Sequence, residues 1–285
     1  WERIFRTSLT RNLNRIQALE LGLEGAQTIR DSTLRMGLDV PGTISPDYSN
    51  LVPVAIDNSL STVEEIRYEP FAVHNWQINS RMTMESSIIY ETSAIEQSGD
   101  INRKRNFDFI KPKFDYRYDI TPYLQLRAGI EKDIDQLSFS DFSASSDNSD
   151  EDKNTQAGNP EIVQEKSWRY ELNLEFRLPN DTGVLNSQFW YRDVEDHIDK
   201  IDASLSSDIL QSARGNIGDG HRYGLNLDIS TKLDQFQISN ALLTTGIRLR
   251  DSEFTDPFLG IKRRQRNNGR WSLNMGFRHD ITSQQ

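Results

Sequence analysis

Hydrophobic and polar residues alternate along much of the chain. Between Trp168 and Leu178 every even-numbered position is apolar or aromatic, whereas the odd-numbered positions include the charged residues Arg169, Glu171, Glu175 and Arg177. Successive side chains of a β-strand point to opposite faces of a sheet, so this pattern predicts a strand with one uncharged face and one charged face. The same division recurs over 19–24, 82–92, 110–119, 124–131, 223–229 and 271–278. The chain is therefore predicted to be all-β.

Short turns alternate with long polar stretches between these strands. We predict short turns near 12–14, 78–80, 120–122, 179–182 and 233–235, and long loops over 27–62, 95–106, 137–165, 195–219 and 251–268. Bacterial outer-membrane barrels have short periplasmic turns and longer extracellular loops. Many of the strands also reach the ~9–11 residues that a tilted membrane strand needs, beyond the ~5–6 usual in soluble sheets. These features predict an antiparallel transmembrane β-barrel wall of about eleven strands.

Aromatic residues gather near the predicted strand ends. Trp76, Tyr118 and Tyr123 lie by short turns, and the residues by the long loops are Trp168, Tyr170 and Trp271. Two such groups are typical of the interfacial girdles of an outer-membrane barrel. Packing of the same residues in an ordinary aromatic core is the alternative.

Three segments fit the strand pattern less well. Pro70 and Pro112 fall inside predicted strands, where each removes a hydrogen-bond donor from the ladder, although a bulge could absorb the loss. The stretch 236–250 is ambiguous, because Ala241, Leu242 and Leu243 are consecutive apolar residues.

Composition narrows the class of protein. The chain has 285 residues, 35% hydrophobic content and a mean hydropathy of -0.67, and it contains no run of ~18 apolar residues, which excludes a helical membrane protein. A β-barrel escapes this test because only alternate strand residues need be apolar. The net charge of -10 argues against a nucleic-acid partner, since phosphate binding requires a basic surface. The absence of cysteine is compatible with an oxidising compartment.

The ends of the sequence suggest a piece of a longer protein. The chain opens on the strand-like segment 1–6 without a signal peptide, and an odd strand count leaves free edges that a complete bacterial barrel does not have. Neither a domain boundary nor a sequence repeat is visible. We therefore expect residues 1–285 to be one partial barrel domain.

Three segments together carry a family resemblance. Residues 158–165, with the sequence GNPEIVQE, and the following strand from Trp168 resemble the Gly-Asn-Pro-x-Leu-x-Pro-Glu segment of TonB-dependent outer-membrane receptors. Residues 189–198 are similar to the next strand of that family, and residues 216–227 resemble the loop return after it. The order and spacing also match, and Gln164 departs from the family by standing where proline is usual.

The resemblance implies a 22-stranded barrel in the bacterial outer membrane, filled by an N-terminal plug that follows a TonB-contacting box. The plug and the terminal strands would lie outside residues 1–285. Such receptors import scarce ligands such as siderophores, cobalamin or glycans with energy relayed by TonB. The expected partners are thus the imported ligand, the TonB system and outer-membrane lipid. The long loops would select the ligand, through residues that the sequence does not identify.

The charged face of the strands would then line the lumen. It includes Lys111, Lys113, Asp115 and Arg117 as well as the charges of 169–177, and its mixed signs suit ion pairs to a folded plug. A hydrated face without a partner is the alternative interpretation.

Two groups of acidic residues are candidate metal ligands. The loop containing Asp141, Asp147, Asp150, Glu151 and Asp152 offers oxygen ligands for Ca²⁺, but its spacing does not match an EF-hand and a solvated loop is the favoured interpretation. The second group surrounds a histidine. His197 has Asp193, Glu195, Asp196 and Asp199 near it in sequence, which could form a metal site. Packing of the strand end through Val194, Ile198 and Ile201 is the favoured reading there.

Enzyme motifs are absent from the sequence. There is no nucleophile elbow, phosphate loop or His-x-x-x-His pair, and no predicted helix follows the glycine-rich segment 215–220. We expect neither catalysis nor a cofactor. Two other functions stay open: a soluble β-sandwich that binds glycans, and a porin-like channel without a plug.

Overall fold

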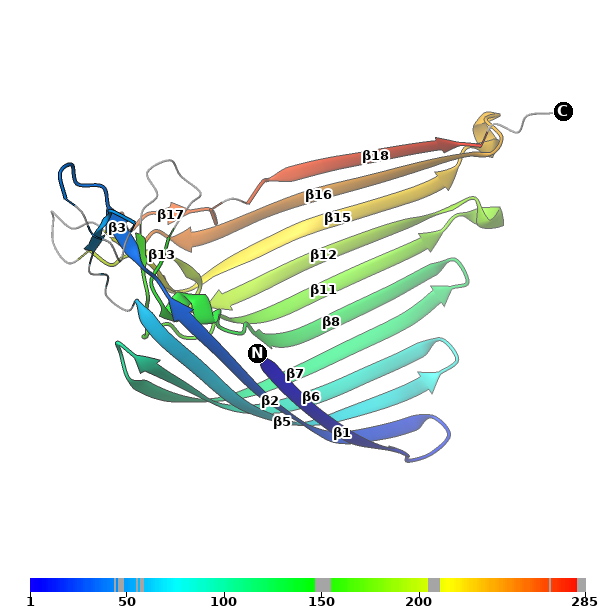
Figure 1. The fold of residues 1–285 in the computed structure, drawn as a ribbon. Helices are drawn as coiled ribbons and strands as arrows, with labels where there is room; N and C mark the ends of the chain where they lie inside the picture. Colours follow the sequence, from blue (N-terminus) through cyan, green and yellow to red (C-terminus); the bar gives the residue numbers. More distant parts are fainter. Residues whose placement is uncertain are drawn as a thin grey trace.

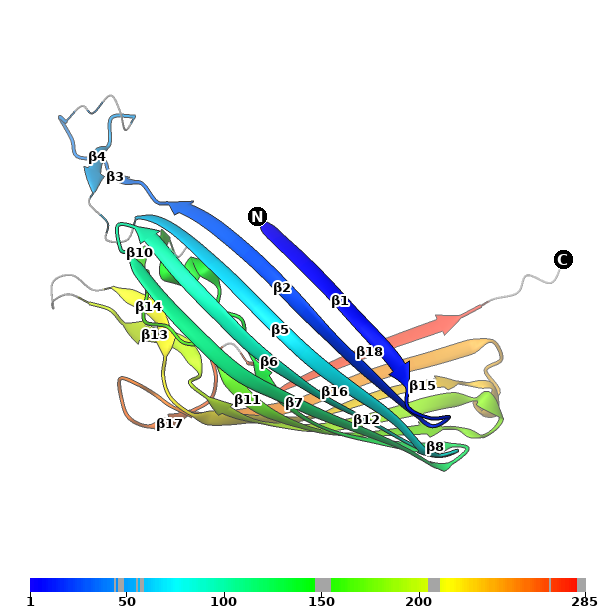
Figure 2. The same cartoon turned by 90° about the horizontal axis from the view of Figure 1, so that it is seen from below.

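Long antiparallel strands form one curved sheet in the computed structural model, which describes residues 1–43, 45, 49–54, 56, 59–146, 155–204, 211–266 and 268–280. Within these residues each long strand pairs with the next one along the chain, from β1 at one edge to β18 at the other. Figures 1 and 2 show that the sheet bends into a trough. The long strands are β1 (Glu2–Asn12), β2 (Gln17–Thr33), β5 (Leu60–Asn79), β6 (Met82–Gly99), β7 (Arg103–Thr121), β8 (Leu124–Ile134), β11 (Lys166–Arg177), β12 (Gly183–Glu195), β15 (Gly220–Lys232), β16 (Ala241–Thr255) and β18 (Trp271–His279).

The connections sort by length, as the sequence predicted. Short turns join the strands at one end, over 13–16, 80–81, 122–123, 178–182 and 233–240. Two of these turns contain a 3-10 turn, η3 (Pro179–Asp181) and η4 (Asp234–Phe236). Long loops gather at the opposite end, over 34–59, 135–165, 196–219 and 256–270 (Figure 1).

One predicted loop is wrong. Residues 95–106 are strand except for 100–102, because β6 continues to Gly99 and β7 begins at Arg103. The strands extend because the inward-facing side chains of Ile95 and Gln97 are buried against the neighbouring loop 135–165. Strands β2, β5 and β16 likewise run several residues into stretches predicted as loops.

The long loops contain short strands of their own. The loop elements β13 (Ile198–Asp202), β14 (Ser212–Asn216), β10 (Thr155–Ala157) and β9 (Ser145–Ser146) form a small four-stranded sheet. A hairpin of β3 (Met36–Leu38) and β4 (Val52–Val54) lies in the first long loop, and β17 (Lys262–Arg263) pairs with the end of β16. Among the described residues, no helix is long and apolar enough to span a membrane.

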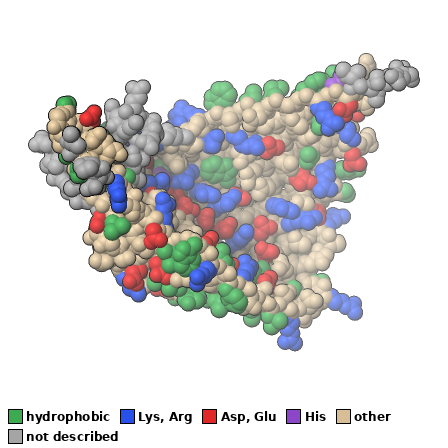
Figure 3. Space-filling model, viewed as in Figure 1, with side chains coloured by type: hydrophobic (Ala, Val, Ile, Leu, Met, Phe, Trp, Pro, Cys, Tyr) green, Lys and Arg blue, Asp and Glu red, His purple; other side chains and the backbone are tan. Residues whose placement is uncertain are grey.

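The two faces of the sheet differ in polarity. The register aligns Leu172, Phe189, Leu225, Leu249 and Trp271 across five neighbouring strands on the outer face. Leu172, Phe189, Leu249 and Trp271 are exposed there, as are Tyr170 and Tyr223 one step toward the long loops. Figure 3 looks into the hollow of the trough, where Lys, Arg, Asp and Glu side chains dominate. The predicted division into an apolar and a charged face is confirmed, and these aromatic residues lie on the apolar surface instead of in a core.

The doubtful segments are accommodated within the sheet. The β5–β6 ladder omits Glu69 and Pro70 but keeps its register between Tyr68 and Phe71. Pro112 lies one residue beyond the end of the β7–β8 ladder, which begins at Lys113. The ambiguous stretch 236–250 divides at Ala241, where β16 begins.

The buried core lies inside the trough at the long-loop end. It consists of Val63, Ile95, Leu137, Phe139, Phe142 and Ile162, with Phe107 and Ile198 packed against it. The 3-10 turn η2 (Phe139–Phe142) carries both phenylalanines, so loop 135–165 folds inward onto β5, β6 and β7. Arg105 donates to the carbonyls of Pro160 and Ile162 at 2.8 and 2.7 Å. This loop is therefore anchored on strands far from its own ends.

Candidate functional site: an arginine-rich groove on the inner wall

The inner wall between β8 and β16 consists of aligned rows of polar side chains. The antiparallel register sets the rows, because directly paired residues point to the same face. The row nearest the long loops contains Glu131, Arg169, Arg192, Arg222 and Ser252. The next row contains Gly129, Glu171, Trp190, Gly224 and Arg250, and the third contains Arg127, Asn173, Gln188, Asn226 and Arg248.

Three arginines stand directly opposite one another in the first row. Like charges in this position destabilise a sheet. Arg169 is neutralised by Glu171 on its own strand, and Arg222 donates to Glu165 at 2.7 Å. Arg192, between them, has no ion-pair or hydrogen-bond partner among the described residues. Its charge acts on Asp135 through space, without a direct contact, so the row keeps a guanidinium group free to bind.

These arginines line a groove of about 540 Å³. Six arginines face it, namely Arg169, Arg192, Arg222, Arg248, Arg250 and Arg266, against one carboxylate, Glu171. The other lining residues are Trp190 and the amides Gln188, Asn226, Gln265 and Asn268. The basic character is specific to this region, because the whole chain carries a formal charge of -10.

Trp190 gives the groove an aromatic surface. A Cβ placed on Gly224 would lie 2.7 Å from the indole Cζ2 and 2.6 Å from the carbonyl oxygen of Leu249. The indole therefore lies across the neighbouring strand, over the one residue type that leaves room for it. A flat aromatic side chain surrounded by guanidinium groups can stack with a ring and can hold anions at its edge.

A buried polar network adjoins the groove through Arg222. His197 is 2% exposed, and its Nδ1 lies 2.5 Å from the Oε2 of Glu165. Burial alone would raise the pKa of Glu165, but the hydrogen bond with His197 and the charge of Arg222 hold that pKa below its ordinary value. A guanidinium nitrogen of Arg222 lies 2.9 Å from the same Nδ1, so the imidazole, the carboxylate and the guanidinium form one cluster. The Phe254 ring lies 4.0 Å from the imidazole and covers it.

The three sequence segments that carry the family resemblance meet around this network. The side chain of Asn216 accepts a hydrogen bond from the backbone N–H of Val163 at 2.9 Å and donates one to the backbone carbonyl of Val163 at 2.9 Å. It also donates to the carbonyl of Asp196 at 2.7 Å, and His197 exchanges backbone hydrogen bonds with Ile217 and Gly218. The motif residues thus join β11, β12 and β14 at the rim of the wall.

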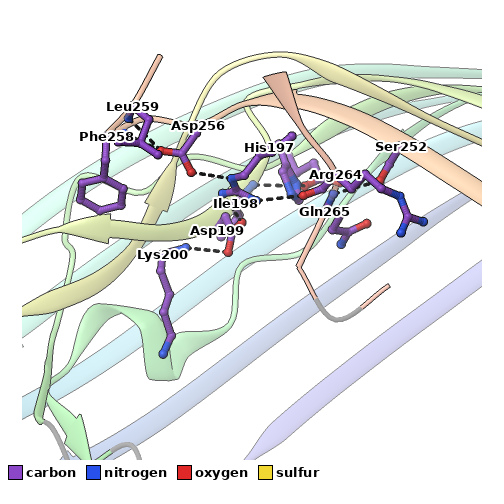
Figure 4. A network of polar contacts seen from close by, with 12 residues as sticks. His197, Ile198, Asp199, Lys200, Ser252, Asp256, Phe258, Leu259, Arg264 and Gln265 are labelled. Carbon is purple, nitrogen blue, oxygen red and sulfur yellow. Dashed lines mark hydrogen bonds and ion pairs between the residues drawn. The ribbon is translucent and has the colours of Figure 1, made fainter. Parts of the chain in front are cut away.

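A second ion-pair set joins the last long loop to β13. Arg263 donates to Asp199 at 2.8 Å and to Asp256 at 2.7 Å. Asp256 in turn accepts from the backbone N–H groups of Phe258 and Leu259, as Figure 4 shows. The loop that carries Gln265, Arg266 and Asn268 over the groove is therefore fixed at its base.

Three of the candidate metal ligands are paired with basic side chains. Asp199 pairs with Arg263, Asp196 pairs with Lys166 at 2.6 Å, and Asp141 pairs with Arg214 at 3.4 Å. Asp147, Asp150, Glu151 and Asp152 lie outside the described residues. In the part of the chain that the structure describes, no group of three or more His, Cys, Asp or Glu side chains could hold a metal ion. Metal binding at His197 or in the acidic loop stays an untested hypothesis.

Sequence reasoning did not find the arginine groove. Its residues come from β11, β12, β15, β16 and the loop 256–270, and they are separated by 97 positions between Arg169 and Arg266. Alternation indicated the inward orientation of Arg169, but the alignment of the strand arginines depends on the register of each strand pair. A register slip of one residue would place every one of them on the opposite face.

Comparison with known proteins gives a consistent assignment. The family model described as TonB dependent receptor-like, beta-barrel matches residues 5–278. No curated protein matches the chain. A solved mutant of the ferric enterobactin receptor PfeA from Pseudomonas aeruginosa is 15% identical with a TM-score of 0.62, covering 99% of this chain and 39% of that one.

Two further structures have the same fold. The copper transporter OprC is 12% identical with a TM-score of 0.71, covering 97% of this chain and 40% of that one. The ferric yersiniabactin uptake receptor FyuA from Yersinia pestis is 14% identical with a TM-score of 0.62, covering 99% and 40%. The chain therefore spans about two fifths of the length of these relatives, and their similarity shows the fold alone.

Proposed function

Because the chain belongs to the TonB-dependent receptor-like β-barrel family, we propose that it forms part of the wall of an outer-membrane uptake receptor. A ligand would enter at the long-loop end, contact the groove on the inner wall and pass inward without covalent chemistry. The observation that carries this proposal is the division of the sheet into an apolar outer face and a charged inner face that holds a basic groove beneath the long loops.

The outer face suits lipid. In water, exposure of its aligned Leu, Phe, Tyr and Trp side chains would cost about 25 cal/mol of free energy per Å² of apolar area. In a bilayer the apolar lipid chains would surround this face favourably, whereas they would disfavour the charged inner face. This asymmetry opposes a soluble β-sandwich, which would bury the apolar face against a second sheet.

The inner face suits a protein partner or a ligand over much of its height. Lys111 pairs with Glu69 and donates to Glu91 at 2.7 Å, and Arg67 approaches Glu69 at 3.2 Å. Membership of this family is the reason that the proposal includes a plug domain and energy coupling through TonB. A porin-like channel without a plug is the second candidate, and the same polar inner face would serve it.

The ligand class is the finer part of the proposal. The similar structures are named as receptors or transporters for ferric enterobactin, copper and ferric yersiniabactin. A siderophore, cobalamin or a glycan would each be a scarce ligand of suitable size for such a receptor.

Cell fractionation tests the proposal. The full-length protein, detected through peptides of this chain, should appear in the outer-membrane fraction and should change its gel mobility on boiling. Uptake of its ligand should stop when the proton gradient is dissipated. A soluble species that ignores boiling would contradict the proposal, and uptake that persists without the gradient would favour the channel.

A further inference from the structure

We propose that the arginine-rich groove between β11 and β16 binds a multiply charged anion that carries a flat ring. The inference rests on the proposed function and narrows its ligand class. It identifies Arg192 and Arg250 as the residues that hold the anionic groups, and Trp190 as the surface on which the ring lies.

The charges call for an anion. Arg192 lies directly between Arg169 and Arg222 in the register and makes no ion pair or hydrogen bond with the described residues, its electrostatic interaction being with Asp135, and the Arg250 side chain has no such partner either. Alignment of like charges opposes folding of the sheet, so their neutralisation by a bound anion would relieve that repulsion. Guanidinium groups bind carboxylate, phosphate and sulfonate through paired, charge-assisted hydrogen bonds.

The aromatic surface calls for a ring. Trp190 is the aromatic member of the groove lining, and its indole occupies the space that a side chain at Gly224 would take. In the register Trp190 lies between Glu171 and Gly224, and Arg250 follows Gly224 in the same row. A ring stacked on the indole would therefore place anionic substituents within reach of Arg250 on one side and the first arginine row on the other.

The size and position favour a small ligand over a plug segment. A groove of about 540 Å³ lies within the ~300–1,000 Å³ range of small-molecule pockets. Gln265, Arg266 and Asn268 of the last long loop line it, so it lies at the end where a ligand would enter. The ion pairs of Arg263 with Asp199 and Asp256 keep that loop in place.

The same charges disfavour a neutral sugar. The amides of Gln188, Asn226, Gln265 and Asn268 could bind hydroxyl groups, but a neutral ligand would leave the unpaired arginines desolvated without compensation. A glycan would need anionic groups to satisfy this groove. The charge of a candidate ligand therefore decides whether it fits this groove, whatever metal it carries.

Binding of pyranine, a flat pyrene ring bearing sulfonate groups, tests the inference. The full-length receptor in non-ionic detergent is titrated with pyranine at low and high salt, and binding is followed by fluorescence anisotropy. We expect saturable binding that weakens as salt rises, and a loss of roughly tenfold or more for Arg192→Gln and for Arg250→Gln. Arg117→Gln is the matched control, since Arg117 is an inner-wall arginine paired with Asp119 toward the short-turn end.

The ring is tested separately. Trp190→Leu should weaken pyranine binding, Trp190→Phe should restore much of it, and competition by tricarballylate, an anion without a ring, should be unaffected by either variant. Neutral pyrenemethanol should not compete.

Absence of saturable binding to the wild-type receptor would overturn the inference, as would equal losses for Arg192→Gln and Arg117→Gln. Unchanged binding in Arg192→Gln with a loss of protease resistance would assign these arginines to plug contacts instead. The fractionation result is independent of all these outcomes, so failure here leaves the proposed uptake function standing.

Discussion

His197 and Glu165 are joined through a buried 2.5 Å contact that connects the start of β13 to the start of β11. The two residues are 32 positions apart, and both are almost fully buried. Arg222, on strand β15, shares Glu165 with His197. Through these contacts one carboxylate holds three segments of the rim together.

This pairing should make the rim sensitive to acid. The pKa of Glu165 lies below its ordinary value of 4.5, so the charged carboxylate favours the folded rim. Its contribution is complete above pH 4.5 and is lost as the pH falls through the lowered folded-state value. We expect the hydrogen-exchange protection factors of residues 196–204, corrected for the intrinsic rate at each pH, to fall in this acidic range.

Glu165→Gln should abolish most of that pH dependence and should accelerate exchange already at neutral pH, because Arg222 would lose its buried counter-charge. Acidification has the opposite effect through Asp135. Burial and the charge of Glu165 raise the pKa of Asp135, so its protonation favours the folded rim. Because Glu165→Gln also removes the charge that raises the pKa of Asp135, the variant Asp135→Asn is measured beside it to separate the two groups. Equal acid sensitivity in wild type and in Glu165→Gln would show that another group controls the rim.

Phe142→Ala should release loop 135–165 from the inner wall. Phe142 is 2% exposed and packs in the core cluster with Phe139, so its truncation should cost about 3–5 kcal/mol through lost contacts and a residual cavity. We expect rapid proteolysis of this loop in the folded receptor. Phe258→Ala, at an exposed loop position, is the matched control and should change little. Equal protease resistance of the two variants would contradict an anchoring role for Phe142.

The sequence predicted the sheet more completely than the site. Alternation in stretches such as Trp168–Leu178 defines both faces of a strand locally, and it therefore predicted strand type, orientation and the order of short and long connections. It did not predict that residues 95–106 are mostly strand. The contacts of Ile95 and Gln97 with loop 135–165 stabilise that extension, and they are distant in sequence.

The site depends on information that one strand does not contain. Arg169 was visible as a charged inner-face residue, whereas Arg248 and Arg250 fell in the ambiguous stretch and Arg266 in a predicted loop. The neighbours of each arginine follow from pairings such as Arg192 with Arg222. The segments 158–165, 189–198 and 216–220 were visible through the family resemblance. Their meeting around His197 required the fold of the loops as well.

Gly224→Ala should displace Trp190 from the wall. The added Cβ would lie 2.6 Å from the carbonyl oxygen of Leu249 and 2.7 Å from the indole, both closer than real Cβ contacts. We expect reduced near-ultraviolet circular dichroism and a red shift of tryptophan emission, with a modest loss of stability. Gly269→Ala is the control, because a Cβ there meets no atom within 4 Å. Identical spectra for both variants would refute the placement of the indole over β15.

Arginine substitutions at two adjacent positions of β11 should separate the faces of the wall. Leu172 points outward between Ala128 and Phe189, whereas Asn173 points inward between Arg127 and Gln188. Leu172→Arg places a charge against lipid, at a cost of about 2–4 kcal/mol near the midplane. Asn173→Arg adds a charge to a hydrated wall, where repulsion from Arg127 costs about 0.2–1 kcal/mol. We therefore expect Leu172→Arg to reduce the heat-modifiable, folded receptor in outer membranes far more than Asn173→Arg does. If the inward variant were the more damaging one, the assignment of the apolar face to lipid would be wrong.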